Sequence, residues 1–159
     1  MTRSVIAIDD AAQRAISLAR FQIRGATEVV RELGGQSLPP VFADSGRIEQ
    51  VVLNLLSNAI QAVEGRAGKI VVHTWSEGEE VCLSVADDGP GIPEAVRARI
   101  FEPFFTTKEP GKGTGLGLTV SQGIVQEHGG RIDVASAASG ATFTVRLPAL
   151  AGALSQPAA

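Results

Sequence analysis

The clearest periodic pattern in the chain runs from residue 45 to residue 64. Apolar residues recur there at intervals of three, four, seven and eight positions, which places them on one face of a helix. Ser45 can cap this helix and Gly65 can end it. Stretches 9–24 and 115–128 have the same spacing, and a glycine follows each of them. The pattern therefore predicts three main helices, the strongest of which is built on Ile48, Val51, Val52, Leu55, Leu56, Ala59, Ile60 and Val63.

Short segments rich in β-branched residues separate these helices and predict strands. They are 27–33, 38–44, 69–75, 80–87, 131–136 and 141–147, and the last four form two predicted hairpins. Helices and strands in this order predict an α/β fold, a two-layer sandwich with about three main helices on one face of a mixed sheet. We expect one domain over residues 1–148. The small residues and prolines of 149–159 predict a flexible tail.

Composition narrows the classes of partner. The 159 residues include 14 basic and 17 acidic side chains, for a net charge of −3, and like charges form no long block. This pattern does not favour nucleic acid. No apolar run is long enough to span a bilayer, so we expect no membrane contact by this domain. The single cysteine, Cys82, fits a reducing compartment, and we expect a cytoplasmic domain, whether or not a longer parent protein is membrane-anchored.

Two asparagines stand on the polar side of the 45–64 helix. Asn54 and Asn58 are four residues apart, so their side chains point the same way one turn apart. A solvated helix face would explain such a pair seen alone, and a ligand site is the alternative.

A glycine turn follows the 80–87 strand, in the sequence DDGPGIP. Asp87 stands at the strand end, and Gly89 and Gly91 let the backbone approach a ligand closely. An ionised Asp87 could accept a hydrogen bond from the exocyclic amine of adenine. An ordinary glycine-rich turn is the alternative, because short glycine motifs match many unrelated loops.

A second glycine-rich segment, 111–117, leads into the third predicted helix. Backbone amides at a helix start can bind phosphate, although a flexible hinge is the simpler explanation. The segment before it is rich in phenylalanine, threonine and lysine, which predicts either a hinged lid that offers hydroxyls and charge to a triphosphate or aromatics packed on the core. The residues concerned are Phe101, Phe104, Phe105, Thr106, Thr107, Lys108 and Lys112, and then Gly113, Gly115 and Gly117.

In this order, the four stretches resemble the N box, first glycine box, F box and second glycine box of the ATP-binding catalytic domain of bacterial sensor histidine kinases. The resemblance runs from about residue 5 to residue 148 and extends to the gyrase, Hsp90 and mismatch-repair ATPases, which share the Bergerat fold. It implies that Asn58 binds Mg²⁺, that Asp87 recognises adenine and that Thr142 supports the adenine site. The ATP-binding residues it implies are Asn54, Asn58, Asp87, Gly89, Gly91, Ile92, Thr106, Thr107, Lys108, Lys112, Gly113, Thr114, Gly115, Leu116, Gly117 and Thr142.

The resemblance also implies a reaction. A histidine kinase domain binds Mg-ATP and transfers the γ-phosphate to a histidine on a separate dimerisation domain, from which a response regulator takes it. Two alternatives stay open: an ATPase of the gyrase or Hsp90 type, and a nucleotide-binding module without catalysis. The relatives that hydrolyse ATP typically have glutamate where this chain has Asn54, and a carboxamide cannot act as a general base. The position therefore favours the kinase, without assigning a catalytic residue.

The acceptor histidine of such a kinase has no candidate in this chain. His73 lies in a predicted strand, and His128 stands at a predicted helix end before two glycines. We expect structural roles for both.

Overall fold

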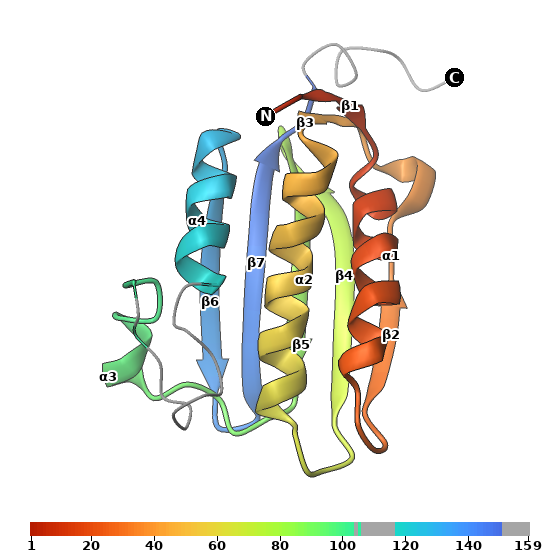
Figure 1. Cartoon of the computed structure of the whole chain (residues 1–159). Helices are drawn as coiled ribbons and strands as arrows, with labels where there is room; N and C mark the ends of the chain where they lie inside the picture. Colours follow the sequence, from red (N-terminus) through yellow and green to blue (C-terminus); the bar gives the residue numbers. More distant parts are fainter. Residues whose placement is uncertain (104, 106–116, 151–159) are drawn as a thin grey trace.

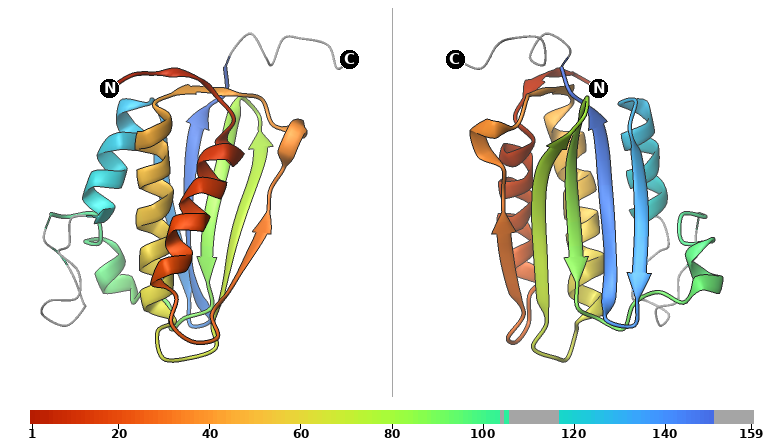
Figure 2. Two further views of the ribbon diagram at one scale, coloured as in Figure 1. Left: turned by 45° about the vertical axis from the view of Figure 1, so that its right-hand side comes forward. Right: turned by 180° about the vertical axis from the view of Figure 1, so that it is seen from behind.

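The computed structural model describes residues 1–103, 105 and 117–150. Helices α1, α2 and α4 lie side by side on one face of the main sheet (Figure 1), and the view from behind shows the strands of the other face (Figure 2). This arrangement confirms the predicted two-layer α/β sandwich. In chain order the elements are β1 (Ser4–Ile6), α1 (Ile8–Ala19), β2 (Glu28–Glu32), β3 (Val41–Ala43), α2 (Ser45–Ala62), β4 (Lys69–Glu77), β5 (Glu80–Asp87), α3 (Glu94–Arg97), α4 (Gly117–Glu127), β6 (Arg131–Ala137) and β7 (Gly140–Pro148).

The main sheet is mixed, as predicted. Its strand order is β2-β4-β5-β7-β6, with β2 parallel to β4 and the other neighbours antiparallel. The predicted strand 38–44 is shorter in the structure and pairs with β1 in a separate antiparallel ladder. The sequence pattern missed β1, because three residues are too few to show an alternation.

Helix α2 is the centre of the core. Its apolar stripe is buried between the sheet and the flanking helices, and Val51, Leu55 and Leu56 are at most 1% exposed. Burial of each such side chain contributes about 1.5–3 kcal/mol. The N-cap is Asp44, one residue earlier than the predicted Ser45, because the Asp44 carboxylate accepts the amide of Arg47 at 3.1 Å. A carboxylate at this position also interacts favourably with the helix dipole.

A histidine joins the end of α4 to the start of α2. His128 is buried, and its Nε2 accepts the backbone amide of Asp44 at 3.0 Å. Its Nδ1 lies 2.7 Å from the carbonyl oxygen of Ile124, which assigns the proton to Nδ1. The Nε2 bond therefore holds the end of α4 against the start of α2, and the Nδ1 bond fixes the ring on α4, in agreement with the predicted structural role.

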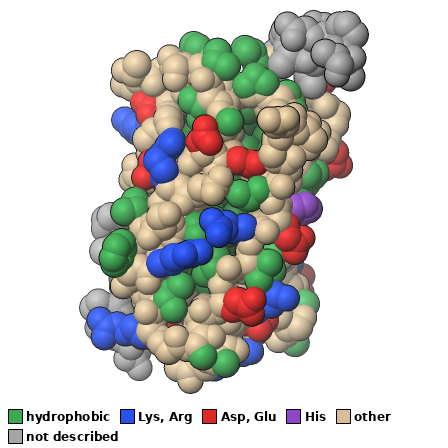
Figure 3. Space-filling model, turned by 90° about the vertical axis from the view of Figure 1, so that its right-hand side faces the viewer, with side chains coloured by type: hydrophobic (Ala, Val, Ile, Leu, Met, Phe, Trp, Pro, Cys, Tyr) green, Lys and Arg blue, Asp and Glu red, His purple; other side chains and the backbone are tan. Residues whose placement is uncertain are grey.

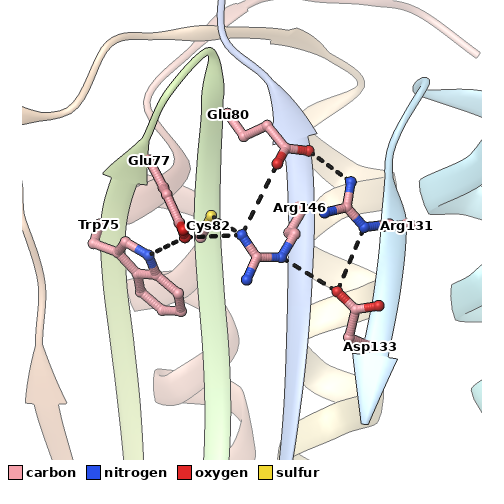
Figure 4. Close-up of polar contacts among 7 residues, drawn as sticks. All are labelled: Trp75, Glu77, Glu80, Cys82, Arg131, Asp133 and Arg146. Atoms are coloured by element: carbon pink, nitrogen blue, oxygen red, sulfur yellow. Dashed lines mark hydrogen bonds and ion pairs between the residues drawn. The ribbon is translucent and has the colours of Figure 1, made fainter.

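The face of the sheet away from the helices carries a network of charged side chains (Figure 4). Arg146 on β7 donates to Glu77 at 3.0 Å and to Asp133 at 3.2 Å. Its hydrogen bond lowers the pKa of Glu77. Arg146 also covers the thiol of Cys82, whose pKa burial raises. The network joins the guanidinium groups of Arg131 and Arg146 to the carboxylates of Glu77, Glu80 and Asp133, and Cys82 beneath it is an inert, buried thiol.

Charges of both signs are also interspersed with apolar groups on the side of the molecule formed by α1 and β2 (Figure 3). This face therefore offers no block of one sign to a polyanion. Within the described part of the chain, no helix combines the length and the apolar character that crossing a membrane requires.

At the C-terminal end, the backbone bonds to the fold beyond β7. The amides of Ala149 and Leu150 donate to the carbonyls of Glu79 and Pro40 at 2.8 and 2.9 Å. The remainder of the predicted tail, residues 151–159, lies outside the described residues.

Candidate functional site

Asn54 connects α2 to the first turn of α4. Its side-chain amide donates to the carbonyl oxygen of Gly117 at 3.3 Å and to the hydroxyl of Ser121 at 3.1 Å. Ser121 is fully buried, so this contact lies inside the fold. Asn54 is therefore not part of a merely solvated helix face. Asn58, one turn further along α2, is half-buried.

Asp87 ends β5 on the side of the sheet that faces the helices. Its carboxylate accepts the amide of Gly89 at 2.9 Å and also the amide of Ala141 on β7. Burial raises the pKa of Asp87, and the two backbone hydrogen bonds oppose that shift. A half-buried carboxylate that keeps free lone pairs can accept a hydrogen bond from a ligand amine.

The turn after Asp87 packs against the β6–β7 turn. Gly91 has a φ of 80°, and a Cβ there would overlap the carbonyl oxygen of Ala137. The next amide, that of Ile92, donates to the hydroxyl of Ser136 at 2.6 Å. Only glycine fits at position 91, because the backbone conformation and the close approach both exclude a side chain. The turn is therefore held in one place beside Asp87.

Thr142 does not lie beside Asp87. On β7 the buried residues Ala141 and Phe143 face the helices, whereas Thr142 pairs with Ala86 on the outer face of the sheet. Side chains alternate between the faces of a strand, so a shift of one residue changes the face. The inward position next to Asp87 belongs to Ala141, and it contributes a backbone amide rather than a hydroxyl.

The segment between α3 and α4 is anchored at both of its described ends. The hydroxyl of Thr119 on α4 donates to the carbonyl of Phe101 at 2.7 Å, and the Phe101 ring meets Phe143 edge-on at 6.5 Å. The guanidinium of Arg99 lies 4.7 Å from the centre of the Phe105 ring. Phe101 and Phe105 thus pack on the core, the simpler of the two predictions for these aromatics.

Half of the predicted ATP-binding residues lie outside the described part of the chain. Of the glycine-rich segment, the structure describes Gly117, whose carbonyl meets Asn54. The residues not described are Thr106, Thr107, Lys108, Lys112, Gly113, Thr114, Gly115 and Leu116.

Sequence reasoning missed two serines. Ser121 accepts a hydrogen bond from Asn54, and Ser136 accepts the amide of Ile92 in the glycine turn. Ser121 could have been found, since it is the polar residue one turn after Gly117 on a predicted helix. Ser136 ends a predicted strand, and nothing in its sequence context signals a bond to Ile92.

Together, the arrangement places a carboxylate, a carboxamide pair and the start of a helix around one side of α2. Such a set can recognise an amine and bind a metal through a carboxamide oxygen, and the helix start can bind an anion. Among the described residues, no three His, Cys, Asp or Glu side chains gather as a metal cluster.

Comparison with known protein families gives one match that covers most of the chain. The sequence profile described as "Histidine kinase-, DNA gyrase B-, and HSP90-like ATPase" matches residues 43–151. Among curated proteins, the signal transduction histidine-protein kinase AtoS of Escherichia coli (strain K12) is 44% identical over 128 residues. The matched region is 79% of this chain and 20% of AtoS, so the chain spans about a fifth of that protein.

Solved structures give the same relationship. The catalytic domain of the histidine kinase ThkA is 35% identical, with a TM-score of 0.83, over 94% of this chain and 97% of that domain. Full-length ShkA in complex with AMPPNP is 30% identical, with a TM-score of 0.79, over 94% of this chain and 31% of that one. ThkA is also known in complex with the response regulator protein TrrA.

Proposed function

Since the chain belongs to the histidine kinase-, DNA gyrase B- and HSP90-like ATPase family, and within it to the catalytic domains of histidine kinases, we propose that it binds Mg-ATP and passes the γ-phosphate to a histidine on a separate dimerisation domain. The observation that carries this proposal is the position of Asp87. It ends β5 on the helix side of the sheet, with its carboxylate fixed by the amides of Gly89 and Ala141.

Adenine is the proposed partner of Asp87. A fixed carboxylate accepts a hydrogen bond from the exocyclic amine, and guanine has a carbonyl at the corresponding place. A site built on this bond rejects a purine that lacks the amine, because the buried acceptor would be left without a donor. Gly89, Gly91 and Ile92 form the proposed backbone wall beside the base. The outward position of Thr142 supports a role for the Ala141 amide in its place.

Mg²⁺ is the proposed metal and Asn58 its protein ligand. A carboxamide oxygen suits this hard cation, which keeps several waters and needs few protein ligands. Asn58 is half-buried on α2, one turn after Asn54, so a ligand there would lie close to the start of α4. When bound, Mg²⁺ neutralises phosphate charge, and Asn58 orients it.

The start of α4 is the proposed phosphate site. The side chain of Asn54 holds the carbonyl oxygen of Gly117. The first backbone amides of a helix have no partner within the helix, so those at the start of α4 can donate to an anion. We assign the phosphate contacts to Gly117 and to Gly113, Thr114, Gly115 and Leu116. Thr106, Thr107, Lys108 and Lys112 are the proposed hydroxyl and charge donors to the triphosphate.

The acceptor is proposed to lie on another domain, and the phosphate to pass on to a response regulator. Both ring nitrogens of His128 are engaged inside the fold. His73 stacks on Trp75 at 4.5 Å on the outer face of the sheet, the face opposite α2 and Asp87. Neither histidine is therefore positioned to take a phosphate from this site.

An ATPase of the gyrase or Hsp90 type is the second candidate, and position 54 argues against it. A carboxamide has no proton-accepting role at neutral pH, and that of Asn54 is occupied with Gly117 and Ser121. A module that only binds nucleotide would not need to position phosphate and metal together.

Radiolabelled ATP tests the proposal. The chain is incubated with Mg-ATP alone, with a matching dimerisation domain, and with that domain after its acceptor histidine is changed to glutamine. We expect label only on the unchanged domain, as an acid-labile and base-stable phosphoramidate. Stable labelling of the chain itself, or an acid-stable product on the partner, would refute the proposal. Weak transfer is expected in this two-part assay, because separating the domains lowers the effective concentration of acceptor.

A further inference from the structure

A hollow lies beside the glycine turn 89–92, between α3 and the β6–β7 turn. Its volume is about 550 Å³. Most of its wall is apolar and comes from Ile92, Pro93, Val96 and Ala137, and among the described lining residues Arg97 alone is charged. Asn54, Asn58 and Asp87 do not line it. It is therefore separate from the carboxylate and carboxamides of the nucleotide site.

Among the residues that the structure describes, Arg97 has no polar partner. Its Nε is buried without a hydrogen bond, and no ion pair to the guanidinium is found among the described residues. Arg99, two residues later, shows the contrast, because its Nε donates to Glu102 at 3.1 Å and its guanidinium covers the Phe105 ring. A desolvated donor on a charged group is costly when it lacks an acceptor. Arg97 is thus prepared for an anion that the described residues do not provide.

We propose that this hollow binds a small organic carboxylate, with its charged end on Arg97 and its apolar body against Ile92, Val96 and Ala137. The volume falls in the range of about 300–1,000 Å³ typical of small-molecule sites. One carboxylate balances one guanidinium and can accept two of its N–H groups. A phosphate dianion would leave an excess charge among apolar walls, and a neutral acceptor would leave the charge of the guanidinium unbalanced.

The hollow shares a wall with the nucleotide site, and this part of the proposal rests on the proposed function. Gly91 and Ile92 line the hollow, and the same turn is anchored by the bond from the Ile92 amide to Ser136. A ligand that fills the hollow biases the position of this turn. Its effect on nucleotide affinity and the effect of nucleotide on its own affinity must then be equal.

Calorimetry with naphthalene-2-carboxylate as the probe tests the site. We expect saturable binding by the unaltered chain and none by its neutral analogue, 2-naphthalenemethanol. Arg97→Gln should weaken the probe about tenfold or more, the size of one charge-assisted contact. Arg99→Gln removes the same charge from the neighbouring residue outside the hollow and should change affinity less than about twofold. Absence of saturable binding, or equal losses in the two variants, would overturn the proposal.

The link to nucleotide is measured by titrating ADP with and without the probe, and the probe with and without ADP. Equal fold-changes in the two titrations support it, and an ADP affinity unchanged by saturating probe overturns it. If ADP itself does not bind, the proposed function has failed, whereas the Arg97-dependent binding of the probe stands on its own.

Discussion

The side-chain amide of Asn54 on α2 donates to the hydroxyl of Ser121 on α4 at 3.1 Å and to the carbonyl of Gly117 at 3.3 Å. The first asparagine of the pair is thus a tether between two helices. It fixes the start of α4 relative to the helix that carries Asn58. The absence of a glutamate at this position therefore does more than remove a base, because a carboxylate would place negative charge against the carbonyl oxygen of Gly117.

Loss of the tether should loosen α4. We expect Asn54→Ala and Ser121→Ala each to lower the free energy of unfolding by about 1 kcal/mol, the usual value of one buried hydrogen bond. Asn54→Asp should cost more, since it replaces the donor to Gly117 with an acceptor. Urea unfolding of the single and double variants measures the coupling. A double variant that is less destabilised than the sum of the singles confirms that the two residues act through each other, and strict additivity would contradict it.

The hydrophobic pattern was sufficient to predict α2, the two hairpins and the two-layer architecture, because these depend on which side chains are buried. The pattern could not predict the pairing of strands that are distant in the sequence. The segment 38–44 alternates well enough to be a strand, yet its partner β1 has only three residues. Contacts between distant segments, such as Ile92 with Ser136, leave no trace in the spacing of residues along one element.

The candidate site shows the same contrast between features that one segment determines and features that depend on how segments pair. Asp87, Gly89 and Gly91 lie together because they are near neighbours in the sequence of one turn. Thr142 was assigned through a motif, and a one-residue difference in that assignment moves its side chain to the other face of the sheet. A motif match therefore identifies the strand more safely than the individual side chain.

Asp87 should lower the stability of the chain in the absence of ligand. Burial raises its pKa above the ordinary value of 3.8, so the folded chain holds this proton more tightly than the unfolded chain does. The protonated carboxyl contributes its full free energy of stabilisation at pH values below 3.8. This contribution is lost as the pH rises through the pKa of the folded state. At pH 7 we expect Asp87→Asn to raise the Tm by about 1–2 °C, a small gain because the group is only half-buried.

Thermal unfolding across pH checks this expectation. The difference between the variant and the unaltered chain should shrink as pH falls toward 3.8. Asp88→Asn is the matched control, because Asp88 is the next carboxylate and accepts the amide of Lys69 at 2.9 Å while pairing with Arg66. It should not raise the Tm. A gain that persists in acid would show that charge burial at Asp87 is not its cause.

The same substitution should remove base selectivity. A carboxylate at position 87 accepts from adenine and opposes the carbonyl of guanine, whereas asparagine can also donate. We expect the unaltered chain to prefer ADP over GDP by about tenfold or more, and Asp87→Asn to lose most of that preference. Titration calorimetry with both nucleotides measures it. Equal binding of GDP by the unaltered chain would remove the adenine assignment.

Asn58 should act through the metal. We expect Asn58→Ala to reduce the gain in ADP affinity on adding Mg²⁺ by about tenfold, while affinity in the presence of EDTA changes less than about twofold. Ser57→Ala, at the preceding position of the same helix, is the control for a general effect on α2. Circular dichroism checks the fold of each variant. Collapse of the fold in Asn58→Ala alone would instead assign Asn58 a structural role.

Gly91 provides the sharpest test of how the fold holds the site. A methyl group at this position meets two obstacles, a φ of 80° and the carbonyl oxygen of Ala137. Gly25 has a similar φ of 94°, and apart from its chain neighbours no described residue lies within 4 Å of an added Cβ, so it carries the first obstacle without the second. Gly25→Ala should therefore cost about 1 kcal/mol of unfolding free energy, the usual strain of this conformation.

Gly91→Ala should cost clearly more, about 2–4 kcal/mol, because the turn must move off Ala137 to relieve the overlap. That movement carries Ile92 away from Ser136 and displaces the turn beside Asp87. ADP affinity should then fall in Gly91→Ala and stay unchanged in Gly25→Ala, at a temperature where both variants are folded. Equal losses of unfolding free energy in the two variants would mean that the turn moves without strain. The contact between this turn and the β6–β7 turn would then not position the nucleotide site.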